Sequence, residues 1–115
     1  MWQSKYHNCP TRCHQGPMHQ SKLESLRCDE LHLMQQGGLI RELQAHPQQR
    51  FRLDVNDVHI CDYLADFVYV DCETGAQVVE DTKGHRTREY ELKVKLMRAI
   101  HGVEIVEVRR VRGRR

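Results

Sequence analysis

The chain has 115 residues, of which 39% are hydrophobic and 30% are charged, and its formal net charge is +2 at pH 7. This length and composition predict one ordinary globular domain with a modest core and exclude a two-domain protein. No stretch is long and apolar enough to span a membrane, and the first ten residues lack the hydrophobic run of a signal peptide.

Residues 1–20 show no hydrophobic periodicity and contain two prolines and a glycine, so we expect a flexible N-terminal arm. The arm holds Cys9, Cys13 and His14, which could ligate zinc, although no second pair of ligands follows at a familiar spacing. The five cysteines of the chain form no regular framework, so we expect reduced thiols in a cytoplasmic protein.

The first predicted helix begins at Ser21 and ends before Gly37-Gly38. Four apolar residues recur at helical spacing and are expected in the core: Leu23, Leu26, Leu31 and Met34. Glu24 has two interpretations. It closes a capping box with Ser21, or it projects from the first turn toward a functional site.

Strand patterns follow the helix. Leu39–Leu43 is a candidate short strand, Phe51 and Leu53 alternate with arginines, and Asn56-Asp57 is a predicted turn. The segment from His59 to Asp71 is predicted to be one long central strand, because both of its faces are largely apolar.

An acidic residue, Asp66, lies in the middle of this predicted long strand. Strict alternation gives two faces, Leu64-Asp66-Val68-Val70 and Tyr63-Ala65-Phe67-Tyr69. An unpaired carboxylate on such an apolar face is costly to bury. A metal ion, Lys83 or solvent at a cleft is therefore expected to compensate the charge of Asp66.

The segment QVVEDTKG, from Gln77 to Gly84, is the next predicted strand, joined to the previous one by a hairpin turn at residues 73–75. Its alternation gives the faces Val79-Asp81-Lys83 and Val78-Glu80-Thr82. Asp66 and Asp81 are then neighbours that repel unless a cation or a proton intervenes. Glu80 is expected to face away and to pair with a cation. The alternative interpretation is an exposed strand end with an ion pair between Asp81 and Lys83.

A second helix is predicted from Arg88 to His101, capped by Thr87 and ended by Gly102. Its expected core stripe is Leu92, Leu96, Ala99 and Ile100. The final strand, Val103–Val108, follows a helix and is expected to return parallel to the QVVEDTKG strand. These elements predict an α/β fold with a small mixed sheet flanked by helices, in the order α-β-β-β-α-β.

The C-terminal residues 109–115 contain five arginines, which leaves the rest of the chain acidic. A basic tail on an acidic body suggests a polyanionic partner. The predicted organisation is thus an arm at 1–20, a folded domain at 21–108 and a basic tail at 109–115.

The ordered set of an acidic first helix, Asp66, and Asp81-Thr82-Lys83 before a basic helix resembles the PD-(D/E)xK nuclease superfamily. More narrowly, it is similar to a family of small phage and prophage proteins of uncharacterised function assigned to that superfamily. The matching stretches are SKLESLRCDEL, YLADFVYVD, VVEDTKG and YELKVKLMRAIHGVEIVEV. The chain has Ala65-Asp66 where the superfamily has Pro-Asp, and Asp81 where a glutamate is commoner.

The resemblance implies a restriction-endonuclease-like core and a magnesium-dependent DNA endonuclease, with manganese as a substitute metal. By resemblance, Asp66 and Asp81 would ligate the metal, Lys83 would assist the attacking water, and Glu24 would complete or orient the site. The residues expected to bind the DNA backbone are Arg86, Arg88, Lys93, Lys95, Arg109, Arg110 and Arg112.

The resemblance also implies action in the cytoplasm of a bacterial host, on DNA and without a membrane partner. A homodimer is expected where both strands are cut. Two other classes stay open: a non-catalytic nucleic-acid-binding module, and a phage assembly or interaction protein. Divalent-metal binding separates the nuclease from both, and salt-dependent DNA binding separates the second class from the third.

Overall fold

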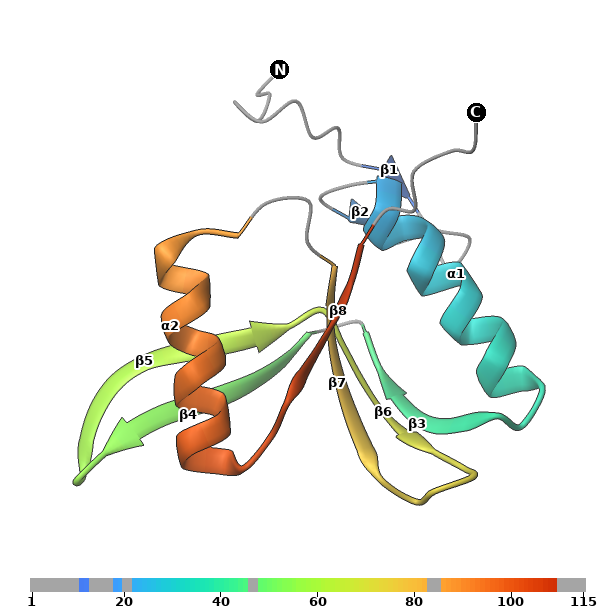
Figure 1. The fold of residues 1–115 in the computed structure, drawn as a ribbon. Helices are drawn as coiled ribbons and strands as arrows, with labels where there is room; N and C mark the ends of the chain where they lie inside the picture. The colour runs from blue at the N-terminus through green and yellow to red at the C-terminus, as the bar shows by residue number, and fades with distance from the viewer. Residues whose placement is uncertain (1–10, 13–17, 20–21, 46–47, 83–85, 110–115) are drawn as a thin grey trace, which may run out of the picture.

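The computed structural model describes residues 11–12, 18–19, 22–45, 48–82 and 86–109 (Figure 1). Most of the predicted arm and tail lies outside these described residues. Several residues with a predicted role also lie outside them: Cys9, Cys13, His14, Ser21, Lys83, Arg110 and Arg112.

A mixed sheet of four strands forms the centre of the fold. Its strands, in spatial order, are β3 (Ile40–Gln44), β6 (Phe67–Asp71), β7 (Gln77–Thr82) and β8 (Ile105–Val108). β6 pairs antiparallel with both β3 and β7, whereas β8 pairs parallel with β7. The α/β mixed-sheet prediction is therefore confirmed, together with the short strand after the first helix, the hairpin and the parallel return of the last strand.

Two helices cover the two faces of this sheet (Figure 1). α1 (Lys22–Gln36) lies on one face, and α2 (Arg88–Leu96) lies on the other and continues into a π-helical turn, η1 (Met97–His101). The Thr87 hydroxyl caps α2 by accepting a hydrogen bond from the backbone nitrogen of Tyr90 at 3.0 Å. Gly102 ends the helix with φ 67°, a left-handed conformation that favours glycine. Both predicted boundaries of this second helix are confirmed.

A separate hairpin, β4 (Gln49–Val55) and β5 (Val58–Ala65), extends from the sheet alongside α2 (Figure 1). Asn56 and Asp57 form its tip with φ values of 50° and 66°, which suits the two-residue turn that follows the right-handed twist of the strands. The hairpin is fixed to η1, because a ring nitrogen of His101 lies 2.8 Å from the carbonyl oxygen of Arg52.

The prediction of one continuous strand from His59 to Asp71 is wrong. β5 ends at Ala65 and pairs with β4, whereas β6 begins at Phe67 and pairs with β3 and β7, so the chain changes sheets at Asp66. The bend also shifts the alternation by one residue. Tyr63 and Ala65 pack on the α2 side of the sheet, whereas Phe67 and Tyr69 pack on the α1 side.

Each face of the sheet has its own core. On the α1 side the buried residues include Cys28, Leu31, Ile40, Phe67 and Tyr69, and on the α2 side Leu53, Tyr63, Val68, Val79, Tyr90 and Met97. Leu26, Leu92 and Ala99 were predicted in these cores but are exposed, the two leucines by 56% and 53%. Leu26 is exposed because Glu24 and Ser25 occupy the buried face of the first turn of α1, so the apolar stripe of this helix is narrower than the leucine spacing suggests.

Four residues of the N-terminal segment form a short antiparallel ladder, β1 (Thr11–Arg12) with β2 (Met18–His19). The Ser25 hydroxyl donates a hydrogen bond to the carbonyl oxygen of Arg12 at 2.9 Å, so the ladder is tied to the first turn of α1. The prediction of an arm without regular structure did not include this ladder. Within the described parts of the chain, no helix has the length and apolar character needed to cross a membrane.

Candidate functional site

A cleft of about 500 Å³ opens where the β4–β5 hairpin, the start of α2 and the strand β7 meet. β7 contributes Asp81, and the bend between β5 and β6 contributes Asp66. The hairpin and the helix contribute further polar residues: Arg50, Asp62, Tyr63, Thr87, Glu89, Tyr90 and Lys93. Its size is that of ordinary ligand sites, and acids and bases dominate its lining.

Asp81 is buried and faces the α2 side of the sheet, as the predicted alternation of β7 requires. The Tyr63 hydroxyl donates a hydrogen bond to Oδ2 of Asp81 at 2.6 Å. Burial, followed by the nearby charge of Asp81, raises the pKa of Tyr63 well above its ordinary value. The phenol is therefore a permanent donor at neutral pH, and it fixes the orientation of the Asp81 carboxylate.

Asp66 is half-buried in the bend between β5 and β6. Its Oδ2 accepts hydrogen bonds from the backbone nitrogen and the hydroxyl of Thr82, at 2.9 and 2.8 Å, and its Oδ1 accepts one from the Gln48 amide at 2.7 Å. The compensation expected for this carboxylate was a metal, Lys83 or solvent. The structure instead provides three neutral hydrogen-bond donors. Two of them belong to Thr82, whose side chain the alternation of β7 places on the face opposite Asp81.

The structure brings Asp66, from the bend between β5 and β6, and Asp81, from β7, to the same cleft. In the described parts of the chain, no cluster of three or more acids, histidines or cysteines is arranged to hold a metal. Two carboxylates are nevertheless enough for Mg²⁺, which commonly keeps several waters and takes one or two protein carboxylates together with substrate phosphate oxygens. The two acids present therefore fit the ligand set of a magnesium site.

Glu24 lies in the first turn of α1, is buried and does not line the cleft. α1 packs on the face of the sheet opposite α2, whereas the cleft lies on the α2 side. The structure therefore does not bring Glu24 into the cleft that Asp66 and Asp81 line.

Glu80 is fully buried on the α1 side, away from Asp81. Arg27 donates two hydrogen bonds to it, from Nε to Oε1 at 2.9 Å and from Nη2 to Oε2 at 2.7 Å, and the Tyr69 hydroxyl donates a third. These bonds to Glu80 are the main cause of the raised pKa of Arg27. The prediction that Glu80 faces away from Asp81 and pairs with a cation is confirmed.

The residues predicted to bind DNA are distributed unevenly. Lys93 lines the cleft and lies 3.3 Å from a carboxylate oxygen of Glu89. Arg86 lies 3.4 Å from Glu107 and over the ring of Tyr90, outside the cleft lining. Three other predicted residues are exposed and do not line the cleft: Arg88, Lys95 and Arg109.

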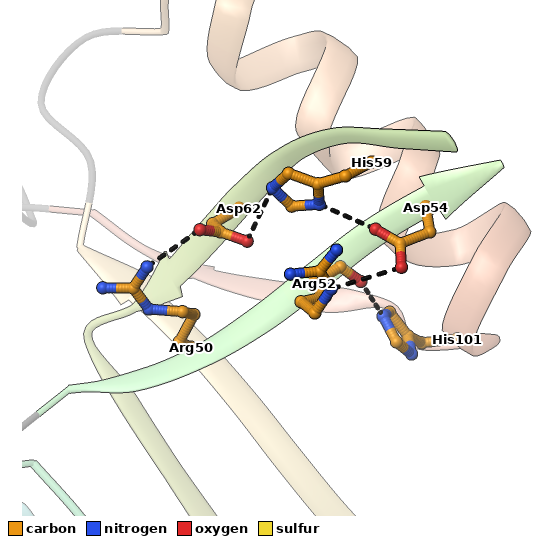
Figure 2. Close-up of polar contacts among 6 residues, drawn as sticks. All are labelled: Arg50, Arg52, Asp54, His59, Asp62 and His101. Carbon is orange, nitrogen blue, oxygen red and sulfur yellow. Dashed lines mark hydrogen bonds and ion pairs between the residues drawn. The ribbon is translucent and has the colours of Figure 1, made fainter. Parts of the chain in front are cut away.

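Sequence reasoning missed Tyr63, Gln48, Arg50 and Asp62 as cleft residues. Arg50 donates a hydrogen bond to Asp62 at 2.8 Å, and the ring of His59 lies between Asp62 and Asp54, at 3.4 and 2.7 Å (Figure 2). The alternation around Phe51 indicated that Arg50 faces solvent, and this pattern was the sequence signal from which Arg50 could have been found. Nothing local marked Tyr63, because its role depends on how the hairpin packs against β7.

A family model described as "Protein of unknown function (DUF1064)" matches residues 3–111. No curated protein and no solved structure matches the chain. Because the family model covers nearly all of the sequence, the chain belongs to this family.

Proposed function

We propose that this member of the DUF1064 family is a magnesium-dependent endonuclease that hydrolyses phosphodiester bonds in DNA. The observation that carries the proposal is the meeting of Asp66 and Asp81 in one cleft, where hydrogen-bond donors orient both carboxylates. The resemblance to PD-(D/E)xK nucleases, which rests on the same two acids and on Lys83, supports the same chemistry.

Asp66 and Asp81 would hold Mg²⁺ or Mn²⁺, which when bound supplies an acidified water and offsets charge on the scissile phosphate. Tyr63 keeps Asp81 in one orientation, and Thr82 and Gln48 do the same for Asp66. Such fixed ligands cost little reorganisation during the reaction.

Two further residues have roles in this proposal. Lys83 follows Asp81 by two positions in the sequence, and its ammonium would position the attacking water or stabilise the developing negative charge. By the resemblance, Glu24 in the first turn of α1 would complete or orient the metal site, although it does not line the cleft.

The charge of the cleft predicts that DNA binding depends on a divalent ion. Its described lining carries four carboxylates, from Asp62, Asp66, Asp81 and Glu89, against two cations, from Arg50 and Lys93. With all of these groups ionised the lining is net negative and repels a phosphate. A bound divalent cation would remove that excess, so the affinity for DNA should fall in chelator.

The first test measures the melting temperature with and without Mg²⁺, because a ligand that binds only the folded state raises it. The parent and the control variant Glu104→Gln, whose side chain is exposed and pairs with Arg98, should both be stabilised. Asp66→Asn and Asp81→Asn should each lose the increment. Equal stabilisation of the double variant and the parent would show that the metal site is elsewhere.

The second test is cleavage of duplex, branched, flapped and single-stranded DNA in Mg²⁺ and in chelator. Lys83→Ala should lose most activity but keep the metal-dependent rise in melting temperature. Glu24→Gln should reduce activity or metal affinity at subsaturating Mg²⁺. An active Lys83→Ala variant would move the catalytic centre away from this cleft, and binding without cleavage would favour the non-catalytic module.

The setting of this activity is inferred from the resemblance to phage and prophage proteins. We place it in the cytoplasm of a bacterial host, with DNA as the partner. A homodimer would be needed for concerted cleavage of both strands of a duplex, and sedimentation with and without duplex DNA would test this.

A further inference from the structure

We propose that Arg50 on the hairpin and Lys93 on α2 together grip the phosphodiester backbone of the nucleic acid, one from each element of the cleft. These two residues are called the cleft cations below. The inference rests on the proposed function, since it names the residues with which the same cleft would bind its substrate.

The cleft cations are the described basic residues that line the same cavity as Asp66 and Asp81. They come from elements that are far apart in the sequence, β4 and α2. The Arg50 side chain is 64% exposed and the Lys93 side chain is 22% exposed, so Lys93 is the more deeply placed of the two. A guanidinium can bind a phosphate through two parallel hydrogen bonds, whereas an ammonium acts as a point charge.

Each cleft cation is oriented by one acid. Nη1 of Arg50 lies 2.8 Å from Oδ2 of Asp62, and Nζ of Lys93 lies 3.3 Å from Oε2 of Glu89. Asp62 is held in turn by His59, which also contacts Asp54 across the hairpin (Figure 2). Ion pairs at such accessible positions are weak, so a phosphate can compete with the acid for the cation.

The other described cations are less suited to the same task. Arg86 and Arg109 share the carboxylate of Glu107, and Arg98 pairs with Glu104; none of these three arginines lines the cleft. A backbone that reaches Asp66 and Asp81 therefore enters the cavity that Arg50 and Lys93 also line. The β4–β5 hairpin thus becomes part of the substrate-binding surface.

The experiment measures the dissociation constant of a fluorescein-labelled 20-nucleotide DNA duplex by anisotropy in Ca²⁺, at several salt concentrations, with the probe checked for integrity on a gel. Each phosphate contact contributes about 0.9 to the slope of log Kd against log salt for duplex DNA. Arg50→Gln and Lys93→Gln should each reduce the slope by about that amount. The control Arg41→Gln, which removes an exposed arginine paired with Glu42 on β3, should leave the slope unchanged.

Substitution of the acids that orient the cleft cations should change the affinity for DNA in the opposite direction. Asp62→Asn and Glu89→Gln remove the competitor for each cation and should tighten DNA binding, provided that circular dichroism and the melting temperature confirm the fold. The inference would be overturned if Arg50→Gln or Lys93→Gln left the salt slope unchanged, as the control Arg41→Gln should. It would also be overturned if both acid variants bound DNA more weakly than the parent.

Failure of this inference is distinguishable from failure of the proposed nuclease function. Metal binding by Asp66 and Asp81 is measured as the rise in melting temperature caused by Mg²⁺. The cleft cations do not ligate this ion. Reduced salt slopes in the cleft-cation variants, without a rise in melting temperature in Mg²⁺, would support phosphate binding by Arg50 and Lys93. The protein would then be a non-catalytic binding module. A metal-dependent rise with unchanged slopes would retain the metal site and overturn the grip.

Discussion

The two sides of β7 carry neighbouring carboxylates in contrasting environments. Glu80 and Asp81 are 1% and 3% exposed, so burial does not distinguish them. Glu80 faces α1 and receives hydrogen bonds from the guanidinium of Arg27 and from Tyr69. Asp81 faces the α2 side, is hydrogen-bonded by the phenol of Tyr63 and lines the cleft.

The comparison shows that the surroundings of a buried acid, rather than its burial, indicate its role. The Arg27–Glu80 pair joins α1 to the centre of the sheet and satisfies both charges within the fold. Asp81 is held in place but opens onto a cavity shared with Asp66. We therefore assign Glu80 to stability, and our proposal assigns Asp81 to metal binding.

The largest expected effect comes from Glu80→Gln. This change removes the buried carboxylate of the pair and leaves the guanidinium of Arg27, which is 19% exposed, with the exposed Glu30 as its remaining carboxylate partner. Loss of one partner of a buried ion pair costs about 3 kcal/mol or more of unfolding free energy. Urea denaturation without metal would measure it.

Asp81→Asn is the matched comparison on the other side of the strand. Asparagine can still accept the hydrogen bond of Tyr63, and the substitution removes repulsion from Asp66, so a cost below about 1 kcal/mol is expected. Equal destabilisation by Glu80→Gln and Asp81→Asn would remove the distinction between the two sides.

The tyrosines on the two sides sharpen the comparison. Tyr63→Phe removes the hydrogen bond to Asp81 and should cost about 2 kcal/mol, because the acceptor is a buried charged group. Tyr69→Phe should cost about 1 kcal/mol, because Arg27 still holds Glu80 with two hydrogen bonds. Only Tyr63→Phe should change the rise in melting temperature caused by Mg²⁺. An equal change in Tyr69→Phe would contradict separate roles for the two sides.

The pH dependence of stability should reveal both tyrosines at alkaline pH. Burial is the main cause of the raised pKa of Tyr63 and of Tyr69 in the folded state. The neighbouring carboxylate, Asp81 for Tyr63 and Glu80 for Tyr69, raises the pKa further. Unfolded tyrosines lose their protons near pH 10, so this stabilisation is complete below about pH 10 and is lost as the pH rises above it. Each tyrosine should contribute a loss of about 1 kcal/mol between pH 10 and pH 11. Denaturation across this range should show a shallower decline in the Tyr63→Phe/Tyr69→Phe double variant, and an unchanged decline would contradict the assignment.

The smallest effect is expected from Thr82→Val. The variant loses the hydroxyl donor to Asp66 but keeps the backbone N–H donor to the same oxygen, so it should cost about 1 kcal/mol or less. The affinity for Mg²⁺, measured by titration calorimetry, should fall modestly because Asp66 is held less firmly. A metal affinity identical to the parent's would show that the backbone bond alone positions Asp66.

The sequence predicted what depends on local chemistry. The cap at Thr87, the stop at Gly102, the turn at Asn56-Asp57 and the alternation that separates Glu80 from Asp81 all depend on adjacent residues. These features were sufficient to predict the α/β class and the approach of Asp66 to Asp81.

The break at Asp66 could not be predicted in the same way. Apolar residues continue on both sides of it, so the pattern looks like one strand, and the donors that stabilise the bend come from Gln48 and Thr82, which are 18 and 16 residues away. Arg50 was missed for a similar reason, since its place in the cleft depends on how the hairpin meets α2. The site residue Lys83 lies outside the described residues, and its role stays a prediction.

The change of sheets at Asp66 also limits how the length of the chain can vary. An extra residue at the hairpin tip, beside Asn56 and Asp57, would lengthen an exposed loop and leave the ladders unchanged. An extra residue between Ala65 and Phe67 would exchange the two faces of the following strand and displace a proposed metal ligand. Members of this family should therefore differ in length at the tip of the hairpin and keep a constant spacing across Asp66.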